Sequence, residues 1–328
     1  MPDINEEKTR QLVKISTFYY LDGLSQQEIA EQLSVSRSHV SRMLSTAKSE
    51  GIVQITIKNP YGDEQQYERQ LKETFGIKNA VVINVPDADQ QMIDLHLARA
   101  GAVLLESIIK HHDIIGIMAG KSVNLLAQEM PFFSRKNLKF VPLVGGWGAE
   151  GATWHANSNT RLFGEKLKSK YFLINAPAVV VSKQARDIIM AEREISDVIE
   201  LARQAAVSVV GIGTVSEEDT IVTSGYFSKE DLHRLRDKGA EAVVCTSFLD
   251  QNGNVIKCEE ESRMIGLSVH ELKNAQNVMA IASGRKKAAA IGAALRGGWI
   301  DFLITDMATA KEVLSLHHSA KNDSSSHP

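Results

Sequence analysis

From residue 80 to residue 316 the chain alternates between short apolar runs rich in β-branched residues and longer stretches with helical spacing. Runs of this length are typical of strands buried on both faces, and helices that alternate with them cover both sides of a mostly parallel sheet. The runs are Ala80–Val85, Ile114–Met118, Phe140–Val144, Ala178–Val181, Val207–Ile212, Ala242–Cys245, Val278–Ala282 and Phe302–Thr305. The helical stretches are Asp94–Lys110, Ser122–Met130, Asn157–Ser169, Lys286–Arg296 and Ala308–Leu316. We predict a doubly wound α/β domain, in which ligands bind beyond the carboxyl ends of the strands.

The first 60 residues follow a different pattern. From Thr9 to Ala47 the apolar residues recur every three or four positions, which predicts three helices. The run Ile52–Ile57 then alternates as a strand does, and turn-forming residues follow it. A length of 328 residues also favours two domains. We therefore predict a helical head with a strand wing over 1–60, an α/β domain over 61–320 and a disordered tail over 321–328.

A helix predicted over Glu64–Phe75 joins the head to the α/β domain. It places Tyr67, Leu71 and Phe75 on one face. This face suits either packing against the α/β domain or a self-association seam, and we favour the former.

Within the head, Ser25–Leu44 has the spacing of a helix-turn-helix. Ser25 and Glu28 form a capping box that predicts a helix starting at Gln26. Ser34 and Val35 supply the turn, with Val35 as its buried anchor, and Ser36 can cap a second helix. A capped helix pair can also belong to a simple bundle, but the face described next favours DNA.

The outer face of the second helix is basic although the chain as a whole is not. The whole chain has 37 basic and 40 acidic residues, and the head is balanced, yet Ser34–Lys48 contains two arginines, one lysine and no acid. Arginine reads guanine edges in the major groove, and hydroxyls suit phosphates. The predicted DNA contacts are Ser36, Arg37, Ser38, His39, Ser41, Arg42 and Lys48. Because one small head binds DNA weakly, we expect a dimer or larger homo-oligomer.

Glycine-rich segments lie at the ends of three of the predicted strands: Gly116–Gly120, Gly145–Gly148 and Gly211–Thr214. Glycine lets backbone N–H groups approach a phosphate or sugar oxygen, and Trp147 could cover a ring face. Plain tight turns are the alternative. The third loop lacks the last glycine of a dinucleotide fingerprint, so it is weak evidence for a nucleotide cofactor.

The segment Ser283–Lys287 places a glycine and three cations between a strand and the first turn of a helix. The helix dipole disfavours positive charge at that end, and a bound anion would offset it. Solvated surface cations are the alternative reading, above all for Arg285 and Lys286.

These motifs together resemble SorC-type bacterial regulators over nearly the whole chain. In the head the resemblance runs through FYYLDGLSQQEIAEQLSVSRSHVSRML (18–44) and SEGIVQITI (49–57), and in the body through DIIGIMAG (113–120), PLVGGWG (142–148), APAVV (176–180), VGIGTV (210–215), FLDQNGN (248–254) and 282–310. It implies a sugar-responsive transcription factor whose body is like sugar-phosphate isomerases, binds a phosphorylated sugar and forms a tetramer. It also implies that Lys287 binds the phosphate and that Asn157 contacts hydroxyls, with helix capping as the alternative for Asn157.

The full set of predicted effector contacts is Gly120, Gly145, Gly146, Trp147, Asn157, Gly213, Gly284 and Lys287. One departure from the family concerns Ala242-Val243, where many relatives carry Gly-Asp. If that acid binds sugar hydroxyls in relatives, the ligand of this chain makes fewer polar contacts or is a different compound.

Two competing functions remain: a sugar-phosphate isomerase with an attached DNA-binding head, and a DNA-binding module with an inert oligomerising body. We predict no enzyme, no catalytic residues, no cofactor and no metal. Glu150 is a weak candidate base, Asp250 suits a turn and Asp306 suits a helix cap. With only Cys245 and Cys258, no disulfide framework or cysteine zinc site is expected. We also expect no membrane association and a cytoplasmic location, because signal-peptide and membrane-spanning segments are lacking.

Overall fold

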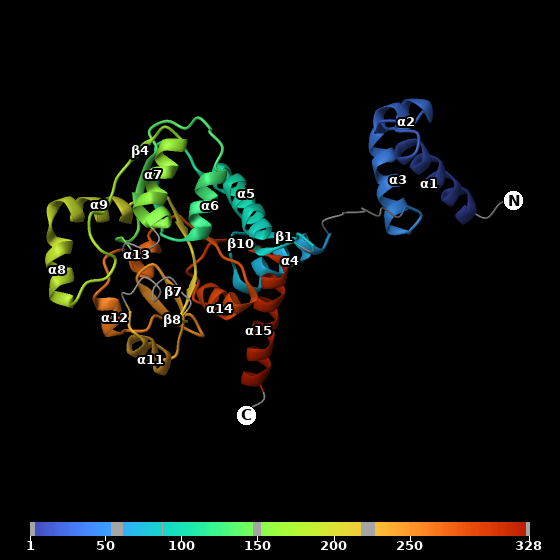
Figure 1. Cartoon of the computed structure of the whole chain (residues 1–328). Coiled ribbons are helices and arrows are strands. Elements are labelled where there is room, and N and C mark those ends of the chain that lie inside the picture. Colours follow the sequence, from blue (N-terminus) through green and yellow to red (C-terminus); the bar gives the residue numbers. More distant parts are fainter. Residues whose placement is uncertain (1–3, 54–61, 87, 147–151, 218–226, 326–328) are drawn as a thin grey trace. The chain divides into compact units, whose positions relative to one another are not determined.

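The computed structural model describes residues 4–53, 62–86, 88–146, 152–217 and 227–325. The chain divides into two compact units, Met1–Pro60 and Tyr61–Pro328. Each unit is described by itself (Figure 1).

The first unit contains three helices, α1 (Ile4–Tyr20), α2 (Gln26–Gln32) and α3 (Arg37–Ser49). They pack around a small core in which Ile15, Ile29, Val40 and Leu44 are buried. The capping box at Ser25 is present: its hydroxyl accepts from the backbone N–H of Glu28, and Glu28 accepts from the N–H of Ser25 at 2.8 Å. The helix-turn-helix is therefore confirmed. Most of the predicted wing, residues 54–57, lies outside the described residues.

The second unit is built on a seven-stranded sheet in which every described pairing is parallel. Its strand order is β1-β10-β9-β5-β2-β3-β4. The strands are β1 (Asn79–Ile83), β2 (Ile114–Ile117), β3 (Lys139–Pro142), β4 (Lys170–Tyr171), β5 (Val207–Val210), β9 (Asn277–Ile281) and β10 (Phe302–Asp306). Strands β2 and β5 are neighbours in the sheet. From β2 the chain continues outward to β3 on one side, and from β5 it continues outward to β9 on the other side. This reversal makes the carboxyl ends of β2 and β5 the topological switch point, where such sheets bind ligands.

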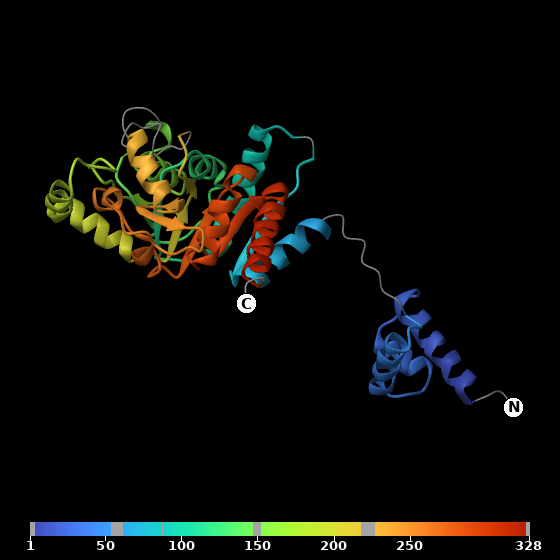
Figure 2. The same ribbon diagram turned by 90° about the horizontal axis from the view of Figure 1, so that it is seen from below.

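Helices cover both faces of the sheet (Figures 1 and 2). Side chains of α5 (Gln90–Ile108), α6 (Lys121–Glu129) and α7 (Ala156–Lys166) share one apolar cluster with the sheet. Side chains of α4 (Gly62–Phe75), α9 (Arg193–Arg203), α14 (Ala288–Arg296) and α15 (Met307–Ser325) share another. Within the described residues, further α-helices are α8 (Lys183–Ala191), α11 (Lys229–Asp237), α12 (Glu259–Ser262) and α13 (Val269–Leu272). The predicted doubly wound α/β domain is therefore confirmed.

Helix α4 packs on the α/β domain. Leu71 is fully buried in its core, and the Phe75 ring meets the His317 ring of α15 with centroids 4.9 Å apart. Figures 1 and 2 both show α4 beside α15. The apolar face of α4 is thus occupied by its own domain, as we favoured from the sequence.

Two predicted strands do not belong to the main sheet. The run Ala242–Cys245 lies in a separate antiparallel sheet formed by β6 (Gly213–Thr214), β7 (Ala240–Val244) and β8 (Ser247–Asp250). The run Ala178–Val181 forms only an isolated bridge, between Val179 and Met264. The strand that follows β3 in the main sheet is instead the short β4, which precedes this run in the sequence. Apolar runs reveal burial but not the pairing partner, which explains both errors.

The C-terminal helix α15 continues to Ser325, beyond the point where the sequence suggested a tail. Its early turns are anchored by the buried side chains of Val313 and Leu314. Once a helix is anchored, each further residue adds a hydrogen bond at little cost. Residues 326–328 lie outside the described part of the chain.

The loop after β8 packs tightly against the end of α14. Asp250 accepts hydrogen bonds from the backbone N–H groups of Asn252 and Asn254, both at 2.8 Å, which confirms its turn-forming role. Gly253 adopts a left-handed φ of 84°, and its carbonyl accepts a 2.7 Å hydrogen bond from the Trp299 indole. A Cβ atom at Gly253 would lie 2.3 Å from the backbone nitrogen of Gly297. Only glycine fits this position.

Both cysteines are free, Cys245 buried and Cys258 half-buried. Burial raises the pKa of Cys258 to about 11 and shifts that of Cys245 even further in the same direction. Within the described residues, no helix has the length and apolar character needed to cross a membrane.

Candidate functional site

The first candidate surface is the outer face of α3. Ser36 caps this helix, its hydroxyl accepting from the backbone N–H of His39 at 3.2 Å. Val40, Leu44 and Ala47 are buried on the inner side. The predicted DNA contacts therefore share the opposite side: all are exposed except His39, which is half-buried.

Two details of the helix-turn-helix bear on its use. Ser34 adopts a left-handed φ of 53°, which gives the sharp turn between α2 and α3. Val35, expected as a buried anchor, is instead 37% exposed, while Ile29 and Ala30 are buried in the core of the head. The Lys48 ammonium lies 5.8 Å from the ring of Tyr20, which holds this cation at the end of the helix.

The second candidate site lies at the carboxyl edge of the parallel sheet. Gly120 follows β2, Gly213 follows β5, Gly284 and Lys287 follow β9, and Asp306 ends β10. The Lys287 ammonium lies 3.5 Å from the carbonyl oxygen of Ile212, so this side chain reaches from the end of β9 to the end of β5. Neighbouring parallel strands thus bring together segments that are 75 residues apart.

The loop at Gly284 is hydrogen-bonded to the end of β10 and the start of α15. Gly284 has a φ of 107°, and its N–H donates to the Thr309 hydroxyl at 2.7 Å and to Asp306 at 3.3 Å. Asp306 also accepts from the backbone N–H of Thr309 at 2.9 Å, which confirms its capping role. The cations of this segment lie on a 3-10 turn (Arg285–Lys287) rather than on the first turn of the α-helix, which begins at Ala288.

The start of α6 is a ready position for an anion. Its N-cap is Gly120 with φ 134°, no side chain caps it, and its first turn has no acidic residue. Backbone N–H groups at such a helix start favour negative charge. Lys121 lies in this first turn, with its ammonium 5.9 Å from the Trp154 ring. The sequence analysis missed Lys121, although its place directly after the glycine could have indicated it.

Gly145 and Gly146 serve a different purpose from the one we expected. The N–H of Gly145 donates to the carbonyl of Ile265 at 3.0 Å, and that of Gly146 donates to Ala176 at 2.9 Å. A Cβ atom at Gly145 would lie 2.6 Å from the carbonyl oxygen of Pro177. These N–H groups therefore bind protein carbonyls, and the absence of a side chain at Gly145 allows close backbone approach. Trp147 and Glu150 lie outside the described residues.

Asn157 neither caps α7 nor points its amide at open space. Its Nδ2 donates to the Ile174 carbonyl at 2.9 Å, and its Oδ1 accepts from the Ile174 N–H at 3.0 Å. The N-cap of α7 is His155. Asn157 therefore ties α7 to the segment after β4, a role that no local sequence signal reveals.

Asn159, which the sequence analysis missed, organises the loop after β2. It is fully buried, and its Nδ2 lies within 3.1–3.3 Å of the carbonyl oxygens of Met118, Gly120 and Trp154. Its Oδ1 accepts from Asn124 at 2.9 Å. A buried amide with this many partners fixes the loop in one conformation.

The departure at Ala242-Val243 lies beside the predicted effector contacts. In the antiparallel sheet Val243 pairs with Gly213, and Ala242 pairs with Thr214. Both side chains are buried. An apolar residue therefore lies next to the glycine loop at the position of this departure.

Groups of histidine, cysteine, aspartate or glutamate able to hold a metal are absent from the residues that the structure describes.

Comparisons with known proteins match both units. Residues 59–315 match the family described as "Putative sugar-binding domain", and residues 16–62 match the "Crp-like helix-turn-helix domain". The deoxyribonucleoside regulator of Bacillus subtilis is 30% identical over 312 residues, covering 95% of this chain and 99% of the relative. The sorbitol operon regulator of Klebsiella pneumoniae is 28% identical, covering 94% and 99%. The crystal structure of that full-length regulator superimposes with a TM-score of 0.75 over 94% of this chain and 99% of the other.

Proposed function

The chain belongs to the SorC/DeoR-type family of transcriptional regulators with a sugar-binding domain, and on this premise we propose that it controls a carbohydrate catabolic operon in response to a phosphorylated sugar or polyol. Helix α3 binds operator DNA, and the carboxyl edge of the α/β sheet binds the effector. The observation that carries the proposal is the convergence of the α6 start, the Gly284 loop and Lys287 at that edge.

The phosphoryl group of the effector lies between the ammonium of Lys287 and the start of α6. Lys287 supplies a full positive charge, and the uncapped helix start supplies oriented N–H donors. Gly120, Gly213 and Gly284 keep the loops free of side chains there. Gly145 and Gly146 contribute to the shape of the edge through their backbone packing.

The remainder of the effector contacts a surface near Ala242-Val243. This surface is less polar than it would be with the Gly-Asp pair that the family resemblance implies for many relatives. Val243 is buried beside Gly213, so no carboxylate from this position receives sugar hydroxyls. A polyol or deoxy sugar with few hydroxyls in this region suits such a wall, because unpaired hydroxyls would lose their hydrogen bonds to water.

We propose sensing rather than catalysis at this edge. Asp306, a carboxylate there, already accepts hydrogen bonds from Gly284 and Thr309. A carboxylate whose oxygens are engaged in this way is not positioned to take a proton from a substrate. The family members named above are regulators, which agrees with a sensing role.

The protein acts as a cytoplasmic homo-oligomer, a dimer or a tetramer. A single three-helix head makes few phosphate contacts, so paired heads on two half-sites are needed for useful affinity. The effector changes DNA binding by having different affinities for two arrangements of the oligomer.

A thermal-shift screen of phosphorylated sugars and polyols tests the sensing role. A ligand present at about 100 times its Kd stabilises the folded state by about 2.7 kcal/mol, so the matching compound should raise the melting temperature of the α/β domain by several degrees. Inorganic phosphate and the unphosphorylated parent compounds are the controls. An absence of any shift across the screen would favour an inert oligomerising body, and turnover of a compound would favour the isomerase alternative.

Lys287→Ala should weaken binding of the effector about tenfold to a hundredfold, because a charge-assisted hydrogen bond contributes about 1.5–3 kcal/mol. Isothermal titration of the compound identified in the screen measures the loss. Operator binding by the effector-free protein should not change. Lys257→Ala removes an exposed lysine elsewhere and serves as the matched control. Equal affinities of the two variants for the effector would remove Lys287 from the site.

A further inference from the structure

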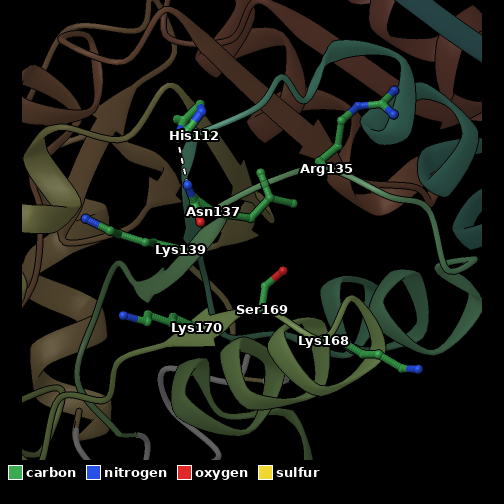
Figure 3. Close-up of a pocket in the computed structure, with 8 residues that line it drawn as sticks. His112, Arg135, Asn137, Lys139, Lys168, Ser169 and Lys170 are labelled. Atoms are coloured by element: carbon green, nitrogen blue, oxygen red, sulfur yellow. Dashed lines mark hydrogen bonds between the residues drawn. The ribbon is translucent and has the colours of Figure 1, made fainter.

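A cavity of about 540 Å³ lies at the opposite edge of the main sheet from the proposed effector site. Its lining comes from the loops that lead into β2, β3 and β4, at the amino ends of these strands (Figure 3). The lining residues are His112, Arg135, Asn137, Leu138, Lys139, Lys168, Ser169 and Lys170. None of the residues in the effector proposal belongs to this set.

The cavity is strongly basic. Four of its eight lining residues are arginine or lysine, and none of the eight is acidic. Within the described part of the chain, no ion pair involves Lys139, Lys168 or Lys170. Lys139 and Lys170 are register partners on adjacent parallel strands, so their side chains leave the same face of the sheet. Figure 3 shows both ammonium groups extending toward the same side. Like charges paired in this way repel each other.

The backbone around the cavity is also unusual. Five described residues other than glycine have left-handed φ values, and three of them line this cavity: His112 at 70°, Asn137 at 55° and Lys168 at 48°. Each such residue other than asparagine costs about 1 kcal/mol or more. Lys168 follows the end of α7, at a position that glycine usually occupies. The Lys168 ammonium lies 5.3 Å from the Phe132 ring, and Figure 3 shows it extending away from Lys139 and Lys170. This lysine therefore adds charge at the outer rim of the cavity at the expense of stability.

Local contacts fix this geometry. The N–H of His112 donates to the carbonyl of Lys136 at 2.8 Å, and the Asn137 amide lies 3.3 Å from Nδ1 of His112. The N–H of Ser169 donates to the Gly164 carbonyl at 2.8 Å, which closes α7. The Ser169 hydroxyl, labelled in Figure 3, donates to the Leu167 carbonyl at 2.9 Å. These contacts hold the loops that lead into β2, β3 and β4 in the positions that form the cavity.

Protection of a sheet edge explains only part of this arrangement. Lysine on an edge strand prevents pairing with other chains, and Lys170 lies on the edge strand β4. Lys139 lies on β3, which is paired on both sides, and Lys168 precedes the strand. Edge protection also does not require left-handed residues in the adjoining loops.

We propose that this cavity binds a small anion that carries two or more phosphoryl groups. Lys139 and Lys170 hold one phosphoryl group between their ammonium groups, and the amide of Asn137 donates a hydrogen bond to its neighbour. The volume lies within the range of about 300–1,000 Å³ that is typical of small-molecule sites. A concave surface closed by three loops favours a compact anion over the extended backbone of DNA.

Titration calorimetry of the full-length protein with sodium tripolyphosphate tests this proposal. We expect saturable binding of one anion per chain, weakened about tenfold or more in Lys139→Gln/Lys170→Gln because two charge-assisted contacts are lost.

The control pair Lys238→Gln/Lys257→Gln removes the same charge at exposed positions away from the cavity and should bind normally. Lys287→Ala should also bind normally, which separates this cavity from the effector site. Lys168→Gly should remove charge from the rim while the fold stays at least as stable, since glycine suits a φ of 48°.

Three results would overturn the proposal. The first is an absence of saturable binding by the parent protein. The second is an equal loss in the control pair, which would indicate a general charge effect. The third is a loss of nonspecific duplex DNA binding, measured by fluorescence anisotropy, in Lys139→Gln/Lys170→Gln without any loss of tripolyphosphate binding; that result would make DNA the occupant.

Discussion

The double variant Arg37→Ala/Arg42→Ala is expected to lose sequence-specific binding to its operator while its α/β domain stays folded. Both side chains are exposed on α3, opposite the buried Val40 and Leu44, so their removal leaves the core of the head intact. A contact between arginine and a base edge contributes about 1–3 kcal/mol. A dimer loses four such contacts, so even about 1 kcal/mol for each weakens binding roughly a thousandfold.

Fluorescence anisotropy with operator DNA, at a fixed and stated salt concentration, measures this loss. The matched control Arg161→Ala/Arg193→Ala also removes two arginines, both exposed and in the α/β domain. It should bind the operator as the parent does. Sedimentation should show the same oligomeric state for all three proteins. If the Arg37/Arg42 variant retains operator affinity, α3 is not the recognition helix.

Gly253→Ala is expected to destabilise the α/β domain by about 3–5 kcal/mol, from a left-handed φ and a backbone overlap acting together. The added Cβ would lie 2.3–2.5 Å from backbone atoms of Gly297 and Ala293, neither of which can rotate away. The loop would have to leave α14, with loss of the 2.7 Å hydrogen bond from Trp299. Domains are commonly stable by about 5–15 kcal/mol, so this one substitution removes a large part of the total.

Thermal denaturation followed by circular dichroism measures this effect, and we expect a fall of roughly 10 °C. Gly239→Ala provides the matched control. Gly239 has a similar φ of 79°, but a Cβ there would meet no atom within 4 Å in the described part of the chain beyond its sequence neighbours, so only the cost of the backbone conformation remains. That variant should lose about 1 kcal/mol. Equal shifts for the two variants would show that crowding at Gly253 contributes nothing.

Much of the fold could be predicted because its signals are local. The capping box at Ser25 and Glu28 marks a helix start. Short continuous apolar runs, separated by stretches with helical spacing, mark the strands of a buried parallel sheet. The pairing partner of each strand was harder to predict, because a buried apolar run such as Ala242–Cys245 looks the same in parallel and antiparallel sheets. The small sheet of β6, β7 and β8 was missed for that reason.

The candidate effector site was predicted less completely than the fold. A sequence shows that glycine is present at Gly145, but not that the N–H group donates to Ile265, 120 residues away. Asn157 and Asn159 look equivalent in sequence, yet the first binds Ile174 and the second binds two carbonyls of the loop after β2 and the carbonyl of Trp154. Such roles depend on tertiary neighbours. The basic cavity has the same origin, because Lys139 and Lys170 become neighbours only when β3 and β4 pair.

The way in which Asn159 and Gly145 hold the carboxyl edge has a consequence for evolution. Both act on backbone groups: Asn159 binds carbonyls of the loop after β2, and Gly145 packs against the backbone at Ala176 and Pro177. Because these contacts involve backbone groups, the loops at this edge can keep their conformation when the surrounding side chains are replaced. If the proposed effector site is correct, exchange of one residue such as Val243 alters ligand preference without refolding the edge. Paralogues would then diverge toward new effectors in single mutational steps while the scaffold persists.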